Sequence, residues 1–265
     1  MMKIDLHGHR AVISGSTAGI GFAIAKGLAE AGAAVVINGR SESAVEEAVR
    51  QLVETLAGAS VEGIAADLAT AHGVTEFLRR AGRADILVNN LGIFEPKPFE
   101  QITDADWHRF FETNVMSGIR LSRHFLPAMR EKNWGRVVFI SSESALNVPA
   151  EMIHYGMTKT AQLAIARGLA QTMAGTGVTV NAVLPGPTRS KGVADFLRDM
   201  AKDADQPTDA IEKEFIAQHR PSSILRRLAT PEEVANMVVY VCSEQASATT
   251  GAALRVDGGV VQYIV

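Results

Sequence analysis

Seven short apolar runs alternate with stretches of helical periodicity, and this alternation restricts the fold more than any other feature of the chain. The runs lie at 11–14, 35–37, 61–65, 86–89, 137–140, 178–184 and 252–256. Several are apolar throughout, as in strands buried on both faces of a parallel sheet. Parallel strands need right-handed crossovers, which here leave few topologies besides a doubly wound sheet. We therefore predict an α/β protein with a mostly parallel, seven-stranded sheet and helices on both faces.

The length and composition suit one domain. A chain of 265 residues with 47% hydrophobic residues can bury one core, so we expect a single domain over 1–265. The stretch 189–227 interrupts the alternation, because it is richer in charge and contains Pro207 and Pro221. We interpret it as a helical insertion that covers the substrate site.

Charge and cysteine content argue against several other classes of protein. The formal net charge is -3, and no long basic or acidic block favours binding to nucleic acid or a membrane surface. Cys242 is the only cysteine, which excludes an intrachain disulfide and fits a reducing cytoplasm. No run approaches the roughly 18 apolar residues of a membrane span, and residues 1–10 do not resemble a signal peptide. We expect a cytoplasmic protein.

A glycine-rich turn lies between the first apolar run and the first predicted helix. Its residues are Gly15, Ser16, Thr17, Ala18, Gly19, Ile20 and Gly21. The spacing is G-x-x-x-G-x-G, which differs from the commoner G-x-G-x-x-G. Glycines let the backbone approach a pyrophosphate closely, and a helix N-terminus presents free N–H groups. Such a turn can be purely structural, but the strand before it and the helix after it favour dinucleotide binding.

Residues after the second and third runs bear on which dinucleotide binds. The second run ends in Asn38, Gly39 and Arg40, where an acidic residue would bind a ribose 2′-hydroxyl. A cation there would pair with a 2′-phosphate, so NADP(H) is favoured over NAD(H); alternatively, Arg40 is a solvated loop residue. After the third run, Asp67 and Leu68 are candidate cofactor contacts. Asp67 would accept a hydrogen bond from the adenine amino group, or would cap the next helix.

Tyr155 and Lys159 lie four residues apart on a predicted helix, shortly after Ser142 at the end of an apolar strand. Positions i and i+4 share one helical face, so Lys159 can reach the neighbourhood of Tyr155. A phenol exchanges protons poorly near neutrality because its pKa is about 10, and an adjacent ammonium favours the phenolate. We expect Lys159 to lower the pKa of Tyr155 and make it a candidate acid or base. Taken alone, the pair also fits a solvated helix surface.

Asn114 is a polar residue in an apolar helical row with Phe110 and Gly118. A buried polar side chain without partners costs about 1–3 kcal/mol, so the amide of Asn114 must find hydrogen bonds. The residues alone leave open whether Asn114 braces the backbone or takes part in catalysis.

Taken together, these motifs resemble the short-chain dehydrogenase/reductase family over nearly the whole chain. The family's Asn-Asn-Ala-Gly segment reads Asn89, Asn90, Leu91 and Gly92 here. Leu91 replaces the usual alanine and enlarges a position close to the cofactor. Further matches are Asn114, Ser142, Tyr155, Lys159, Pro185, Gly186, Thr188 and the C-terminal Asp257, Gly258 and Gly259.

The resemblance implies a Rossmann fold and an NAD(P)(H)-dependent oxidoreductase that transfers hydride between the nicotinamide and a carbonyl or secondary alcohol. Tyr155 would act as acid or base, Ser142 would hydrogen-bond the reacting oxygen, and Lys159 would pair with the phenolate and bind the nicotinamide ribose. A water-mediated proton relay would pass through Asn114 and Lys159.

The same resemblance implies which groups bind the cofactor and how the chain assembles. The cofactor would be bound by the glycine turn together with Asn90, Gly92, Tyr155, Lys159, Pro185, Gly186 and Thr188. Thr188 would contact the nicotinamide carboxamide. The helix through 160–173 and the helix around Asn114 would form the contacts of a homodimer or homotetramer.

The sequence leaves three hypotheses for the function open. We favour a free small ketone, sugar or alcohol as substrate over a 3-oxoacyl thioester on an acyl carrier protein, because carrier docking needs cations beside the site. Lys132 and Arg136 offer such cations, but residues 171–177 include none. From a different class, the chain would be a catalytically silent dinucleotide-sensing protein, against which the retained Ser142, Tyr155 and Lys159 argue.

Three histidines are weaker candidates. His7 and His9 form a His-x-His pair, but two ligands with no clear third do not make a metal site, and we expect none. His154 precedes Tyr155 and would line the substrate pocket or serve in packing.

Overall fold

A parallel sheet of seven strands forms the centre of the computed structural model, which describes residues 3–190, 193 and 208–264. The order in the sheet is β3-β2-β1-β4-β5-β6-β7, and every neighbouring pair is parallel. The strands are β1 (Arg10–Ile13), β2 (Ala34–Gly39), β3 (Val61–Ala65), β4 (Ile86–Asn89), β5 (Gly135–Ile140), β6 (Val178–Pro185) and β7 (Ala253–Val256). The predicted doubly wound sheet is therefore confirmed.

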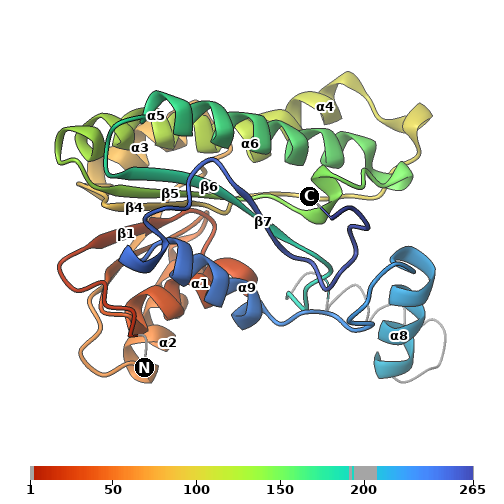
Figure 1. Cartoon of the computed structure of the whole chain (residues 1–265), viewed down its shortest axis with the longest axis horizontal. Helices are drawn as coiled ribbons and strands as arrows, with labels where there is room; N and C mark the ends of the chain where they lie inside the picture. The colour runs from red at the N-terminus through yellow and green to blue at the C-terminus, as the bar shows by residue number, and fades with distance from the viewer. Residues whose placement is uncertain (1–2, 191–192, 194–207, 265) are drawn as a thin grey trace.

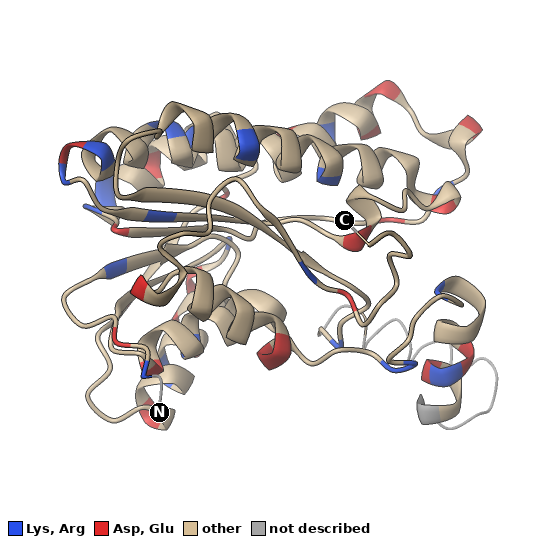
Figure 2. Ribbon diagram, viewed as in Figure 1, with Lys and Arg blue, Asp and Glu red and all other residues tan. Residues whose placement is uncertain are grey.

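Helices cover both faces of the sheet (Figure 1). The helices are α1 (Gly19–Glu30), α2 (Glu42–Thr55), α3 (Ala71–Ala81), α4 (Asp104–Phe111), α5 (Ser117–Glu131), α6 (Ile153–Thr172), α8 (Thr208–His219) and α9 (Pro231–Val241). Helices α3, α5 and α6 lie on one face, and α1, α2 and α9 lie on the other. Figure 2 shows charges of both signs interspersed along these outer helices.

Alternate residues of each strand pack into two separate cores. In β1, Ala11 and Ile13 belong to the core under α1 and α9, whereas Val12 belongs to the core under α3, α5 and α6. Successive side chains of a strand point to opposite faces, so both faces need apolar residues. This is why the strand sequences are nearly continuous apolar runs instead of alternating patterns.

Side-chain caps define the starts of several helices, but α1 has none. Ser41 caps α2 and Thr70 caps α3 by accepting backbone N–H hydrogen bonds. Thr230 and Glu233 form a reciprocal capping box at α9. Helix α1 starts after Ala18, whose side chain makes no capping hydrogen bond. The first N–H groups of α1 are thus left for another acceptor.

The order of the strands places a crevice at the ends of β1 and β4. The chain leaves β3 at one edge of the sheet and returns to β4 on the other side of β1, which is the switch point where doubly wound folds bind ligands. Helix α8 lies apart from the sheet, beyond this region (Figure 1). Of the predicted covering insertion at 189–227, residues 191–192 and 194–207 lie outside the described residues. No described helix is long and apolar enough to span a membrane.

Candidate active site

Two pockets flank the start of α1 at the carboxyl ends of the strands. One has a volume of about 200 Å³ and includes Thr17, Ala18 and Arg40 in its lining. The other has a volume of about 230 Å³ and includes Ile20 and Tyr155. Because Thr17 and Ala18 line one pocket and Ile20 lines the other, the uncapped N-terminus of α1 lies between them. One elongated ligand can therefore occupy both pockets with an anionic middle at this helix end.

The glycine turn allows the close approach that such a ligand needs. Gly15 and Gly19 have φ angles of 60° and 57°, in the left-handed region that glycine tolerates. A Cβ on Gly21 would lie 2.4 Å from the Gly15 carbonyl oxygen and 2.5 Å from the Asn90 amide nitrogen. Asn90 Nδ2 holds this turn by donating to the carbonyl oxygens of Ser14 and Gly15, at 3.0 and 2.8 Å. The residues present thus fit a dinucleotide pyrophosphate.

Most of the predicted site residues line one of the two pockets, and a few line neither. The lining of the Arg40 pocket contains Gly15, Thr17, Arg40, Asp67 and Leu68. The lining of the Tyr155 pocket contains Ile20, Asn90, Gly92, Ser142, Tyr155, Lys159, Pro185, Gly186 and Thr188. Neither lining includes Ser16, Gly19, Gly21 or Asn114. The Ser16 side chain is fully buried, donating to Ile13 and accepting from Asn38, so it serves the fold of the turn.

The Arg40 pocket is built around the end of β2. Asn38 is buried, and its side chain accepts from the Gly15 N–H and donates to the carbonyl oxygens of Ile64 and Ala66. Asn38 is thereby committed to joining β1, β2 and β3. Asp67 accepts from the Ala69 N–H at 3.1 Å, which forms a turn before α3, and the cap of α3 itself is Thr70.

Leu91, the departure from the family's alanine, also contributes to the Arg40 pocket. Its backbone N–H donates to the Ser14 hydroxyl at 3.0 Å, and the Asn90 N–H donates to the same oxygen at 2.9 Å. The larger side chain is accommodated without loss of these bonds between β1 and the segment after β4.

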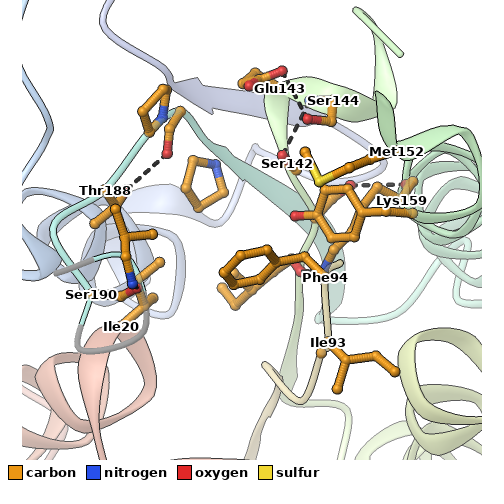
Figure 3. A pocket seen from close by; sticks show the side chains of 18 of the residues that line it. Ile20, Ile93, Phe94, Ser142, Glu143, Ser144, Met152, Lys159, Thr188 and Ser190 are labelled. Atoms are coloured by element: carbon orange, nitrogen blue, oxygen red, sulfur yellow. Dashed lines mark hydrogen bonds between the residues drawn. The ribbon is translucent and has the colours of Figure 1, made fainter. Parts of the chain in front are cut away.

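Ser142, Tyr155 and Lys159 meet in the second pocket. Figure 3 shows Ser142 and Lys159 there. Ser142 follows β5, whereas Tyr155 and Lys159 lie on adjacent turns of α6. Lys159 Nζ lies 5.6 Å from the centre of the Tyr155 ring and donates to the Ile140 carbonyl oxygen at 3.0 Å. The helical spacing thus places the ammonium beside the phenol, and the end of β5 holds it there.

The pKa of Tyr155 shifts in the direction opposite to our expectation. Burial raises this pKa to about 12, while a hydrogen bond with Ser142 offsets part of the rise. Burial also lowers the pKa of Lys159 to about 8. The predicted lowering of the phenol pKa by the ammonium is therefore wrong for the chain by itself, because desolvation is the larger effect. At neutral pH the phenol is protonated, which suits a proton donor.

Asn114 lies in a π-helical turn, Glu112–Met116, between α4 and α5. Such turns are rare in proteins as a whole, and those that occur are often at functional sites. Its side chain accepts from the Ile93 N–H at 2.8 Å and donates to the Ile93 carbonyl oxygen and the Thr158 hydroxyl, both at 3.0 Å. The buried amide therefore braces the segment after β4 against α6.

Gln162 links Asn114 to Lys159 directly. Gln162 Nε2 donates to the Asn114 carbonyl oxygen at 2.5 Å, and its Oε1 lies 3.4 Å from Lys159 Nζ. Gln162 is buried three residues after Lys159 on α6. Its amide therefore fixes the position of the ammonium relative to the π-helical turn.

Sequence reasoning missed the ion pair of Glu143 and Arg220 in the same pocket. Glu143 follows Ser142, and its carboxylate accepts from Arg220 Nε at 2.7 Å. Burial raises the pKa of Glu143, and Arg220 partly opposes that rise. The two residues are 77 positions apart, so no local pattern connects them. His154 does not line the pocket: it is fully buried and packs against Phe110.

The cations considered for carrier docking lie away from the pocket. Lys132 and Arg136 are at the amino end of β5, whereas the site is at its carboxyl end. Lys132 Nζ pairs with Asp85 at 2.6 Å, and Arg136 is buried beside Glu244. Among the described residues, no cluster of three metal-ligating side chains occurs.

The known proteins that this chain is similar to are described as reductases or oxidoreductases. Residues 15–261 match the family model described as "Enoyl-(Acyl carrier protein) reductase". The chain is 48% identical to an uncharacterised oxidoreductase of Bacillus subtilis over 99% of its length and all of the relative's. It is 33% identical to a 3-oxoacyl-[acyl-carrier-protein] reductase of Aquifex aeolicus, over 98% of this chain and all of that one.

Among solved structures, L-sorbose reductase from Gluconobacter frateurii, complexed with NADPH and L-sorbose, is similar with a TM-score of 0.92. It is 32% identical, and the match covers 99% of this chain and all of the other. The fold and these similarities define the class: the chain belongs to the short-chain dehydrogenase/reductase family of oxidoreductases.

Proposed function

We propose that the protein is an NADP(H)-preferring reductase of a small, free carbonyl compound. The observation that carries the proposal is the convergence of Ser142, Tyr155 and Lys159 in one pocket beside the uncapped start of α1. A bound dihydronicotinamide would supply hydride to the carbonyl carbon. The chain supplies the proton, so the carbonyl becomes a secondary alcohol.

Each side chain has a defined part in this proposal. The Tyr155 hydroxyl donates its proton to the substrate oxygen, which gains negative charge as its carbon is reduced. Ser142 hydrogen-bonds the same oxygen, an interaction that strengthens as the charge grows. Lys159 stabilises the tyrosinate left behind and binds the nicotinamide ribose. Asn114 positions α6 through Thr158 and, with Gln162, supports Lys159.

Two features favour a free small substrate over a carrier-bound thioester. The pocket has a volume of about 230 Å³, below the roughly 300–1,000 Å³ of sites for drug-sized ligands. Lys132 and Arg136 each pair with a carboxylate and lie at the amino end of β5, whereas the pocket is at its carboxyl end. Steady-state assays of a carbonyl panel and of a 3-oxoacyl carrier protein test the choice. Turnover of the thioester alone would contradict it.

The NADP(H) preference follows from Arg40. Arg40 lines the pocket at the end of β2, and the segment Asn38, Gly39 and Arg40 contains no carboxylate that would accept from the ribose 2′-hydroxyl of NAD(H). Two similar solved structures were reported with NADPH and with NADP, which supports this choice.

Replacing Arg40 by Asp should lower the ratio of kcat/KM for NADPH to that for NADH by at least about 100-fold, because a carboxylate repels the 2′-phosphate and accepts from a ribose hydroxyl. Steady-state kinetics with both coenzymes measure the ratio. Arg50→Asp, the same charge change on the exposed face of α2, is the matched control. A preference for NADPH that survives Arg40→Asp would show that another group reads the phosphate.

A further inference from the structure

The wall of the Tyr155 pocket beyond Ser142 carries a polar group that the proposed chemistry does not use. Glu143, Ser144 and Arg220 all line this pocket. Figure 3 shows Glu143 and Ser144 beside Ser142, across the pocket from Thr188 and Ser190. Glu143 and Ser144 come from the short helical turn after β5, and Arg220 follows α8. The group therefore joins the end of β5 to the residue that follows α8.

This group is tied directly to Ser142. The Ser144 N–H donates to the Ser142 hydroxyl at 3.1 Å, and the Ser144 hydroxyl donates to Glu143 Oε2 at 3.1 Å. Glu143 Oε1 accepts from Arg220 Nε at 2.7 Å. A substrate whose carbonyl oxygen lies at Ser142 would thus place its neighbouring carbon atoms beside Glu143 and Arg220.

The hydrogen-bonding capacity of the pair is only partly used. A carboxylate accepts about four hydrogen bonds, and within the described part of the chain Glu143 accepts from Arg220 and Ser144. Arg220 donates through Nε and through Nη1, which bonds to the His219 carbonyl oxygen. Its Nη2 has no hydrogen-bond partner among the described residues. A hydroxyl group both donates and accepts, so it matches a carboxylate next to a guanidinium N–H that bonds to no other described residue.

The balance of charge disfavours a substrate carboxylate at this place. Arg220 is shared by Glu143 at 2.7 Å and Glu151 at 3.6 Å. Asp257 adds negative potential at Glu143. Lys159 is the other cation of the described lining, and it is held at Ile140 and Gln162. An anion would therefore meet an excess of negative charge.

We propose that Glu143, Ser144 and Arg220 form a hydroxyl-binding subsite that selects an uncharged, polyhydroxylated ketone and rejects ketones that carry a carboxylate. The inference rests on the proposed carbonyl reduction and names its substrate class. Phe94 and Met152, which also line the pocket, give the carbon chain of such a substrate an apolar surface.

Three six-carbon ketones test the subsite with the full chain and NADPH. They are L-sorbose, 5-keto-D-gluconate, which has a carboxylate in place of the terminal CH₂OH of that sugar, and 2-hexanone, which has no hydroxyl group. We expect wild-type kcat/KM for L-sorbose to exceed that for 5-keto-D-gluconate at least tenfold. Equal values, or a preference for the keto acid, would overturn the proposal.

Glu143→Gln removes the charge and nearly preserves the shape. We expect the ratio of kcat/KM for 5-keto-D-gluconate to that for L-sorbose to rise at least tenfold in this variant. Dividing both by the value for 2-hexanone separates selectivity from a loss of folded enzyme. Glu62→Gln, an exposed carboxylate paired with Arg10 on the outer edge of the sheet, is the matched control and should leave the ratio unchanged. An unchanged ratio in Glu143→Gln would contradict the subsite.

The arms of this experiment separate its two possible failures. Turnover of 2-hexanone without any gain from hydroxyl groups would refute the subsite and leave the reductase intact. No turnover of any of the three ketones with NADPH or NADH would refute carbonyl reduction itself. The wild-type comparison decides the point even if Glu143→Gln fails to fold.

Discussion

Replacing Tyr155 by Phe should lower kcat for carbonyl reduction by at least about 100-fold, the range expected when a general acid is removed. The change deletes one oxygen from the pocket and keeps the ring that Lys159 approaches at 5.6 Å. Because burial raises the pKa of Tyr155 to about 12, the phenol holds its proton at neutral pH and is poised to donate it. The dissociation constant for NADPH should change less than threefold, because the ring of Tyr155 and the other groups proposed to bind the coenzyme all remain.

Single-turnover kinetics and fluorescence titration with NADPH measure the two quantities. Tyr263→Phe, which removes the exposed phenol near the C-terminus, is the matched control and should retain full activity. Retention of more than a tenth of the wild-type kcat by Tyr155→Phe would rule out Tyr155 as the proton donor.

Replacing Lys159 by Ala should weaken NADPH binding as well as turnover, each by at least about tenfold, because one ammonium serves both the ribose and the phenol oxygen. Burial lowers the pKa of Lys159 to about 8, so the ammonium is present below that pH and is lost above it. In the wild type, kcat/KM for NADPH reports the free enzyme and should therefore fall as the pH rises through about 8.

Equilibrium titration of NADPH at pH 7 and pH profiles of both proteins test this role. Lys26→Ala, which removes a half-buried lysine on α1 paired with Glu30, is the control. Lys159→Ala should also lose the decline above pH 8. An unchanged dissociation constant for NADPH would refute the ribose contact.

The sequence predicted the sheet well because its physical signal is local. Each strand is buried on both faces, so its apolar run is visible without knowledge of its neighbours. Tyr155 and Lys159 could also be predicted as a pair, because one helical turn brings them together whatever the rest of the chain does. The strand-turn-helix context likewise located the glycine turn.

The remaining features depend on contacts between distant segments. Nothing in the spacing of Phe110, Asn114 and Gly118 distinguishes the π-helical turn at Glu112–Met116 from an ordinary helix. Glu143 and Arg220 meet only because the residue that follows α8 lies at the pocket. The direction of the Tyr155 pKa shift depends on how deeply the fold buries the phenol, which its neighbours in sequence do not reveal.

Transfer of deuterium from NADPH that carries deuterium at both C4 positions of the dihydronicotinamide tests the central claim most directly. With L-sorbose or 2-hexanone in ordinary water, the account predicts one deuterium bound to the carbinol carbon of the product, detected by mass spectrometry and NMR, and an exchangeable proton on its oxygen. Product that forms without deuterium at that carbon, or oxidation of the coenzyme with no reduced product, would contradict hydride transfer in this pocket.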